Sequence, residues 1–283
     1  MKTSRLETPD DRADTPWNQP GSHSSIGENG WLFILPSLFF LALLAVPLAA
    51  LVTRAVGPGF WTYATSHSAL VALRLSLFTS LISVFVTVLL GTPLAYILAR
   101  RKFPLKSWLE VLIDLPMVLP PSVAGLALLI AFGRRGLLGP ALSMFSISLP
   151  FTTAAVILAQ TFVAAPLYVR AARIGFSGVE MQLEEAAHVE GASQWQLFLE
   201  VMLPLTGRFL LNGAILTWTR ALGEFGATIL FAGNLEGVTQ TMPLAIYLGF
   251  ESNLGVAVAL SVMLLAVSIV LVAATRRLER EHP

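Results

Sequence analysis

The chain has 283 residues, of which 55% are apolar and only 12% are Asp, Glu, Lys or Arg. Because soluble domains carry about 25% charged residues, this composition excludes an ordinary water-soluble globule and indicates a membrane protein. The formal net charge is only +1 and cysteine is absent, which disfavours nucleic-acid binding and excludes disulfides, thiolate metal sites and cysteine nucleophiles.

Residues 1–29 differ in kind from the rest of the chain. They are rich in proline, serine, glycine and aspartate and hold too little apolar surface to fold alone. We expect a disordered tail there, and not a secretory signal, because acidic residues outnumber basic ones in it.

Six mostly apolar windows follow, each about as long as a helix that crosses a bilayer. They cover residues 31–52, 71–99, 108–132, 149–169, 209–232 and 254–274. The sequence therefore predicts an all-α polytopic membrane protein with six transmembrane helices. The membrane domain spans residues 30–276 and a short tail follows at 277–283.

The basic residues set the expected orientation. Thirteen of the 18 Lys and Arg residues lie on the side that holds both termini, four on the other side and one within a span. By the positive-inside rule, both termini and the long loop at 171–208 are cytoplasmic. The apolar segment at 242–250 then faces outward, and it is too short to cross, so we expect a surface or re-entrant segment where a soluble protein could dock.

The second window carries small or hydroxylated residues at steps of three and four, which places them on one helix face. They are Ser76, Ser80, Ser83, Thr87 and Gly91. We favour a packing seam against another helix, with the lining of a polar pathway as the alternative.

Prolines interrupt the third window at Pro116, Pro120 and Pro121. Each removes a backbone donor, which lipid tolerates only where neighbours or cavity water repair the helix. We expect either a discontinuous helix that faces the interior or a kink needed only for packing. Asp114 lies near the cytoplasmic end of this window, at the membrane interface.

The loop at 171–208 is too long to be a simple connection. Apolar residues recur there at helical spacing in two runs that meet near Gly191, so we expect two short amphipathic helices, the second ending at Pro204. Its glutamates are available to cationic partners or merely solvate an exposed face; they are Glu184, Glu185, Glu190 and Glu200. We assign His188 to the surface and not to a metal site.

This loop carries a specific spacing of residues. Glu185, Ala186 and Ala187 are followed by three residues and then by Gly191. Nine more residues lead to Val201, and Leu203 and Pro204 follow after one further residue. The pattern resembles the E-A-A-x3-G-x9-I-x-L-P signature of permease subunits of bacterial ABC importers, with Val201 in place of Ile. The resemblance implies a type I importer permease fold, in which this loop is the coupling loop that enters a cleft of a separate ATPase subunit.

The fifth window contains Arg220 and Glu224, although a charge at the centre of a membrane helix costs about 2.5–3.5 kcal/mol. Four residues apart on one helix face, they can pair and should point into the bundle or a cavity. They form either a structural ion pair or a polar element of a transport route or gate. The other candidate route residues are Thr217, Thr228, Pro120, Pro121 and Ser122.

Two further stretches, 115–129 and 220–247, resemble permeases of molybdate and tungstate importers, with sulfate permeases as close relatives; the likeness covers about residues 69–275. It implies import of a tetrahedral oxyanion, molybdate or tungstate, across the bacterial inner membrane. One alternative is a permease for sulfate or thiosulfate. Another, from a different class of transporter, is an ion-coupled secondary transporter. The implied partners are a second copy of the chain, two ATPase subunits, an external oxyanion-binding protein and membrane lipid.

The chain has no phosphate-binding loop of the G-x-x-x-x-G-K-[ST] type, so it is not expected to be an enzyme or to bind a cofactor; ATP and Mg²⁺ belong to the partner.

Overall fold

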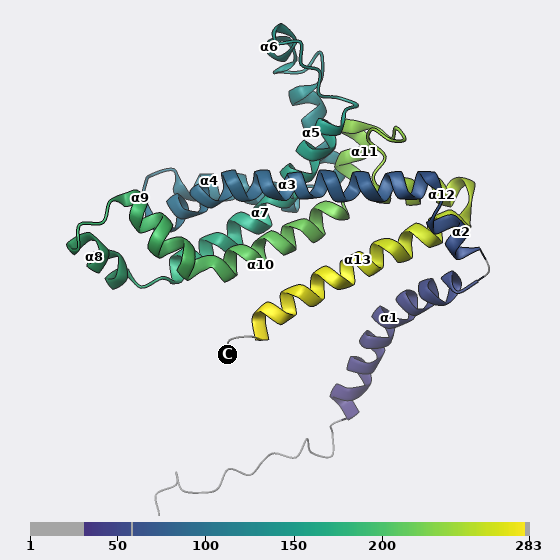
Figure 1. The fold of residues 1–283 in the computed structure, drawn as a ribbon, viewed down its shortest axis with the longest axis horizontal. Helices are drawn as coiled ribbons and strands as arrows, with labels where there is room; N and C mark the ends of the chain where they lie inside the picture. Colours follow the sequence, from purple (N-terminus) through teal and green to yellow (C-terminus); the bar gives the residue numbers. More distant parts are fainter. Residues whose placement is uncertain (1–30, 58, 281–283) are drawn as a thin grey trace, which may run out of the picture. The chain divides into compact units, whose positions relative to one another are not determined.

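The computed structural model describes residues 31–57 and 59–280 (Figure 1). The chain divides into two units, residues 1–50 and 51–283, and each is described by itself. The predicted tail at 1–29 lies outside the described residues. Of the predicted tail at 277–283, residues 277–280 continue the last helix and the remainder also lies outside.

The first unit contains most of one long helix, α1 (Trp31–Ala55). Its 25 residues carry no acidic side chain and only one basic one, Arg54, in the last turn. This length spans the hydrocarbon of a bilayer. The helix therefore matches the first predicted span.

The second unit is built from helices alone within the described residues. In chain order they are α2 (Phe60–Ala64), α3 (His67–Arg100), α4 (Lys106–Val118), α5 (Pro121–Phe132), α6 (Gly139–Met144), α7 (Thr153–Gly178), α8 (Met181–Val189), α9 (Gln194–Gln196), the π-helix η2 (Leu197–Met202), α10 (Leu203–Leu222), α11 (Gly226–Ala232), α12 (Met242–Ser252) and α13 (Leu254–Arg280).

Among the described residues, five helical runs are long and apolar enough to cross a membrane, and the pair α4 and α5, bent by 116°, makes a sixth when the two are counted as one broken span. This confirms the six predicted spans and the discontinuity of the third. The bend lies at Leu119 and Pro120, which both adopt extended backbone. Each precedes a proline, and a proline disfavours helical backbone at the residue before it.

The fifth span differs from the prediction of 209–232. One helical run extends from Gln194 to Leu222, and the chain then breaks before α11. We predicted that the second helix of the loop ends at Pro204. Instead, Pro204 lies in the first turn of α10. The preceding π-helix explains this, because the Leu203 N–H bonds to the Phe198 carbonyl, five residues back, and the wider turn accommodates the proline ring.

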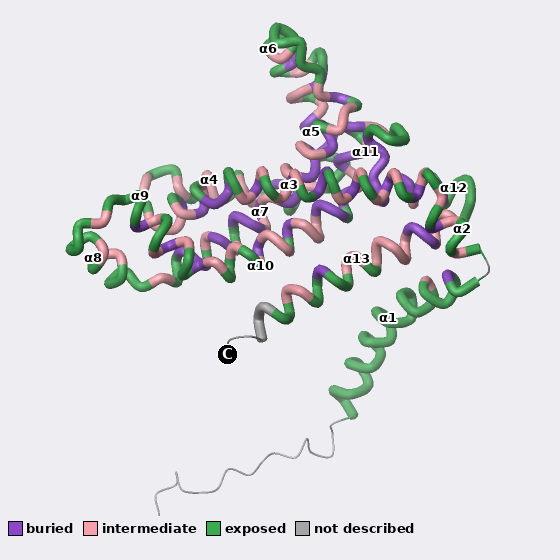
Figure 2. The backbone as a smooth tube through the Cα atoms, viewed as in Figure 1, coloured by how far each residue is buried: buried purple, intermediate pink, exposed green. Residues whose placement is uncertain are grey.

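One core of the second unit lies where α3, α7 and α10 face one another, as the buried segments in Figure 2 show, and two further buried clusters join α5, α7 and α11, and α3, α12 and α13. The small-residue face of α3 is buried along its length. Ser83 accepts a hydrogen bond of 3.0 Å from the Thr161 hydroxyl, and Ser80 accepts one of 2.9 Å from the Trp218 indole. The stripe is therefore a packing seam, with hydroxyls that join α3 to both neighbours.

Two ion pairs fasten α4 to α7. Arg170 lies 2.8 Å from Asp114, and Arg173 lies 2.7 Å from Glu110. Because α7 continues to Gly178, both arginines belong to a helix, and the predicted loop at 171–208 begins eight residues later than expected.

The contact between α7 and α10 predicts a matched pair of stability effects. A Cβ atom added at Gly175 would lie 2.6 Å from Cβ of Phe209, whereas one added at Gly207 meets nothing within 4 Å. We expect Gly175→Ala to lower stability by about 1–3 kcal/mol through overpacking, and Gly207→Ala to preserve or raise it. Thermal unfolding of the purified protein in detergent measures both; equal midpoints would contradict the packing.

Candidate functional site

The first part of the candidate site is a helical hairpin, residues 179–202, which we call the α8–α9 hairpin. It starts where α7 ends: Val179 and Glu180 have extended backbone, and α8 follows. On the other side of Gly191, α9 and η2 lead without interruption into α10. The two predicted amphipathic helices are therefore present, and one of them is continuous with a membrane span.

Gly191 makes the turn of this hairpin. Its φ of +88° lies in the left-handed region, where a residue with a Cβ is strained and glycine is not. The Gly191 N–H donates to the His188 carbonyl and the Ala192 N–H to the Ala187 carbonyl, at 3.0 and 2.9 Å. These two bonds form the Schellman motif that closes a helix C-terminus, so the break predicted at this glycine has a defined geometry.

The second arm of the hairpin is capped by side chains. Ser193 and Gln196 form a reciprocal capping box: the serine hydroxyl accepts from the Gln196 N–H, and the glutamine carbonyl oxygen accepts from the Ser193 N–H. Gln194 lies 3.3 Å from the imidazole of His188, which joins the two arms across the turn. These contacts cap the start of the second arm and hold it beside the end of the first.

One side of the hairpin packs on the membrane helices. Leu197 and Met202 are fully buried against α3 and α7. The Phe198 ring lies 5.0 Å from that of Tyr96 and 6.2 Å from that of Phe176. Ala187 is partly buried against this cluster.

The other side of the hairpin is exposed and mixes apolar side chains with carboxylates. Glu185 and Ala186 of the signature face solvent. The large exposed apolar residues of the hairpin are Met181, Leu183, Val189, Trp195 and Leu199, and the exposed carboxylates are Glu180, Glu185, Glu190 and Glu200. Glu184 does not belong to this set, because it pairs with Arg100 of the same chain and is not free for a cationic partner.

The second part of the candidate site is the break between α10 and α11. Arg220 lies in the last turn of α10, and its Nη1 atom lies 2.7 Å from Oε2 of Glu224. The predicted pair is confirmed, although Glu224 lies beyond the end of α10 and not on its face. Its other oxygen, Oε1, accepts a hydrogen bond of 2.8 Å from the Ala227 N–H in the first turn of α11.

The two broken spans meet at this point. A Cβ added at Gly226 would lie 2.7 Å from Cβ of Pro121, and one added at Gly125 would lie 2.9 Å from Cα of Ala227. The starts of α5 and α11 are therefore in close contact, as the ribbon also shows (Figure 1). The sequence predicted Arg220 and Glu224 as a pair and Pro121 as a break in another span, and the structure brings these two segments together.

The remaining predicted route residues do not all converge. The Thr217 hydroxyl points to the Ala164 carbonyl of α7, at 3.5 Å, inside the helix packing. Thr228 is buried with no hydrogen-bond partner for its hydroxyl among the described residues. Pro120 and Ser122 are exposed at the bend before α5. The described residues hold no group of three or more His, Asp or Glu arranged for a metal ion.

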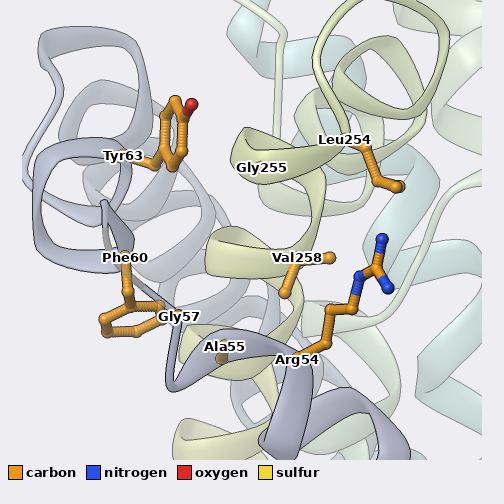
Figure 3. Close-up of a pocket in the computed structure, with 8 residues that line it drawn as sticks. All are labelled: Arg54, Ala55, Gly57, Phe60, Tyr63, Leu254, Gly255 and Val258. Atoms are coloured by element: carbon orange, nitrogen blue, oxygen red, sulfur yellow. The ribbon is translucent and has the colours of Figure 1, made fainter.

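A separate pocket of about 230 Å³ lies between the last turn of α1, helix α2 and the start of α13 (Figure 3). The Arg54 side chain extends toward Leu254, and the Tyr63 ring lies beside Gly255. A Cβ at Gly255 would lie within 3 Å of that ring. None of the residues predicted for function lines this pocket.

The comparisons with known proteins decide the family. A family described as "Binding-protein-dependent transport system inner membrane component" matches residues 91–281. The chain belongs to this family. It is 43% identical over 242 residues to the molybdenum transport system permease protein ModB of Mycobacterium tuberculosis, which covers 86% of this chain and 91% of that protein. It is 36% identical over 204 residues to the molybdate/tungstate transport system permease protein WtpB of Thermococcus kodakarensis, which covers 71% of this chain and 77% of that protein.

Solved structures agree on the fold. The chain superposes with a TM-score of 0.74, at 16% identity, on a bacterial ABC transporter involved in the import of alginate, which covers 91% of this chain and 97% of that one. Its TM-score with the MetNI methionine ABC transporter is 0.54 at 19% identity, with 83% and 97% covered. The fold of this membrane component is therefore that of a type I ABC importer permease, as the sequence predicted.

The geometry at the break predicts the effect of removing its carboxylate. Glu224 is 1% exposed and satisfies both a guanidinium and a backbone amide. We expect Glu224→Ala to cost about 3–5 kcal/mol, because it leaves both donors unpaired, and Glu224→Gln to cost less, because the amide oxygen can still accept from Ala227. Arg220→Gln should cost as much as Glu224→Ala, since it leaves the buried Glu224 carboxylate without its counter-charge. Thermal unfolding in detergent measures all three; an Ala variant as stable as the parent would show that the pair does not hold the break.

Proposed function

We propose that this chain is the membrane subunit of an ATP-driven importer of a tetrahedral oxyanion, molybdate or tungstate. The observation that carries the substrate class is the 43% identity, over nearly the full length of both chains, to a molybdenum transport permease. The geometry that supports ATP-driven transport is the α8–α9 hairpin, whose exposed signature residues are available to another subunit.

The proposed mechanism uses one helical run as a lever. The run from Gln194 to Leu222 has 29 residues and is therefore about 40 Å long. A displacement of the hairpin by an ATPase subunit is carried along this run to Arg220. There Glu224 joins α10 to α11, and α11 packs on α5, so both broken spans would move with the lever.

The break offers groups of the right charge for an anion. The Arg220 side chain is one-third exposed, while Glu224 is buried, paired with that guanidinium and hydrogen-bonded to the Ala227 N–H. A transient contact between an oxyanion and Arg220, as a charge-assisted hydrogen bond, fits this arrangement. Glu224 itself would repel the anion and acts on the position of Arg220.

The complete transporter in this proposal contains two copies of the chain, two ATPase subunits that hold ATP and Mg²⁺, and an external binding protein. The chain itself binds no cofactor and catalyses no reaction. The bias of Lys and Arg supports a cytoplasmic position for both termini and the hairpin, on the side where ATP is found. The membrane is then the bacterial inner membrane, with lipid around the outer helix faces.

Reconstitution of the whole complex tests this function. Proteoliposomes that contain the chain, its ATPase subunit and its binding protein should accumulate molybdate when ATP is supplied on the hairpin side, with tungstate as a competitor. Preferential uptake of sulfate would move the chain to the sulfate permeases. Uptake driven by an ion gradient without nucleotide would support the secondary-transporter alternative and contradict the proposal.

The turn at Gly191 yields a prediction for coupling. Gly191→Val forces a β-branched residue to a φ of +88°, a strain of about 1–2 kcal/mol, and should change the angle between the two arms. We expect the number of anions imported per ATP hydrolysed to fall, while Gly191→Asn, which tolerates this backbone, stays near the parent. A Val variant with full coupling would count against the hairpin as the lever.

A further inference from the structure

The two arms of the α8–α9 hairpin are attached to the membrane helices in different ways. The second arm is continuous with α10, so it cannot move without that helix. The first arm is joined to α7 only through Val179 and Glu180, which are extended, and a Cβ added at Gly178 would meet nothing within 4 Å. The backbone between α7 and α8 therefore makes few contacts that would prevent a rotation of α8 about Val179 and Glu180.

One side chain from a third helix bridges this joint. Arg100 is the last residue of α3. Its Nη2 donates a hydrogen bond of 2.8 Å to the Val179 carbonyl, at the end of α7, and its Nε lies 2.6 Å from Oε1 of Glu184, in the first turn of α8. The Nε–H is not aligned on that oxygen, so the second contact is an ion pair and not a hydrogen bond.

The ion pair is well shielded from water. The side chains of Arg100 and Glu184 are 13% and 16% exposed, whereas those of Arg170 and Asp114 are 51% and 38% exposed. Ion pairs lose strength as solvent reaches them. Of the ion pairs described between different helices, the one at Arg100 is therefore best placed to transmit force.

We propose that Arg100 is a positioning residue for energy coupling: its guanidinium fixes α8 to the ends of α3 and α7, so that a displacement of the hairpin moves these two helices together with α10. This inference rests on the proposed function, since it describes how the same hairpin passes on the motion of an ATPase. Without the contact, α8 follows the ATPase about the joint at Val179 and Glu180, while α3 and α7 stay in place. ATP is then hydrolysed with less transport.

The test compares transport with ATP hydrolysis in the assembled complex. Proteoliposomes carry the parent chain, Arg100→Gln, Glu184→Gln, the double variant or Arg100→Lys, each with the ATPase subunit and binding protein, and molybdate uptake and phosphate release are measured on the same vesicles. The control is Arg101→Gln, which removes an equal charge from the adjacent, exposed residue; Arg101 forms no side-chain hydrogen bond or ion pair with the described residues.

We expect the number of anions imported per ATP to fall roughly three- to tenfold in both single Gln variants. The double variant should be no worse than Arg100→Gln alone, because both lack the ion pair to Glu184 and the hydrogen bond to Val179. Arg100→Lys should be intermediate, since one ammonium group cannot serve Val179 and Glu184 with the geometry of a guanidinium. Arg101→Gln should match the parent.

Other outcomes overturn the inference. If uptake and ATP hydrolysis fall together with the amount of assembled complex, the contact is only structural. If the ratio is unchanged, if the losses add in the double variant, or if Arg101→Gln loses as much, the ion pair is not the coupling contact. Should Arg100→Gln fail to assemble, Glu184→Gln and Arg100→Lys decide. A parent complex without ATP-driven uptake would refute the proposed function itself, whatever the variants do.

Discussion

The break between α10 and α11 depends on a single carboxylate. In the hydrocarbon of a bilayer, a helix can be interrupted only where every freed backbone group finds a partner. Glu224, almost completely buried, accepts from the guanidinium at the end of α10 and from a backbone N–H at the start of α11. The charge that would be costly in lipid is neutralised by Arg220, and the helix end that would lack an acceptor receives one. Neither residue could hold this position without the other.

The close packing around that break explains why two interrupted spans lie together. Gly226 and Gly125 let the backbones of α5 and α11 approach to distances that a side chain would prevent. The bend before α5 follows from two successive prolines and the extended residues before them, and the break before α11 is held by Glu224. A motion of α10 therefore reaches α5 through rigid contacts between short helices. Short rigid pieces joined at defined breaks can change their relative angle, which a continuous helix cannot do without bending.

The sequence predicts those features that depend on local chemistry. Apolar length predicted the spans, the spacing of Ser76, Ser80 and Ser83 predicted the packing seam, and Gly191 predicted the turn of the hairpin; the structure agrees on each. Apolar length does not predict where a helix continues beyond the hydrocarbon. We therefore did not predict that α7 reaches Gly178. Nor did we predict that the second arm of the hairpin continues through Pro204, which the preceding π-helix accommodates. The pairing of Arg100 with Glu184 was missed as well. The two residues are 84 positions apart, and only the packing of α7 beside α3 brings them into contact.

The two polar contacts that matter most use opposite charges for the same reason. At the end of α7, a carbonyl lacks an intrahelical donor, and the Arg100 guanidinium supplies one to Val179. At the start of α11, an amide lacks an acceptor, and the Glu224 carboxylate supplies one to Ala227. A cation suits the C-terminal end of a helix and an anion the N-terminal end, in line with the helix dipole. Each of these groups also pairs with a residue on a neighbouring segment, Glu184 or Arg220. The charges that satisfy interrupted helices in this fold are thus the same charges that join one helix to the next, and an interruption becomes a point where motion passes between them.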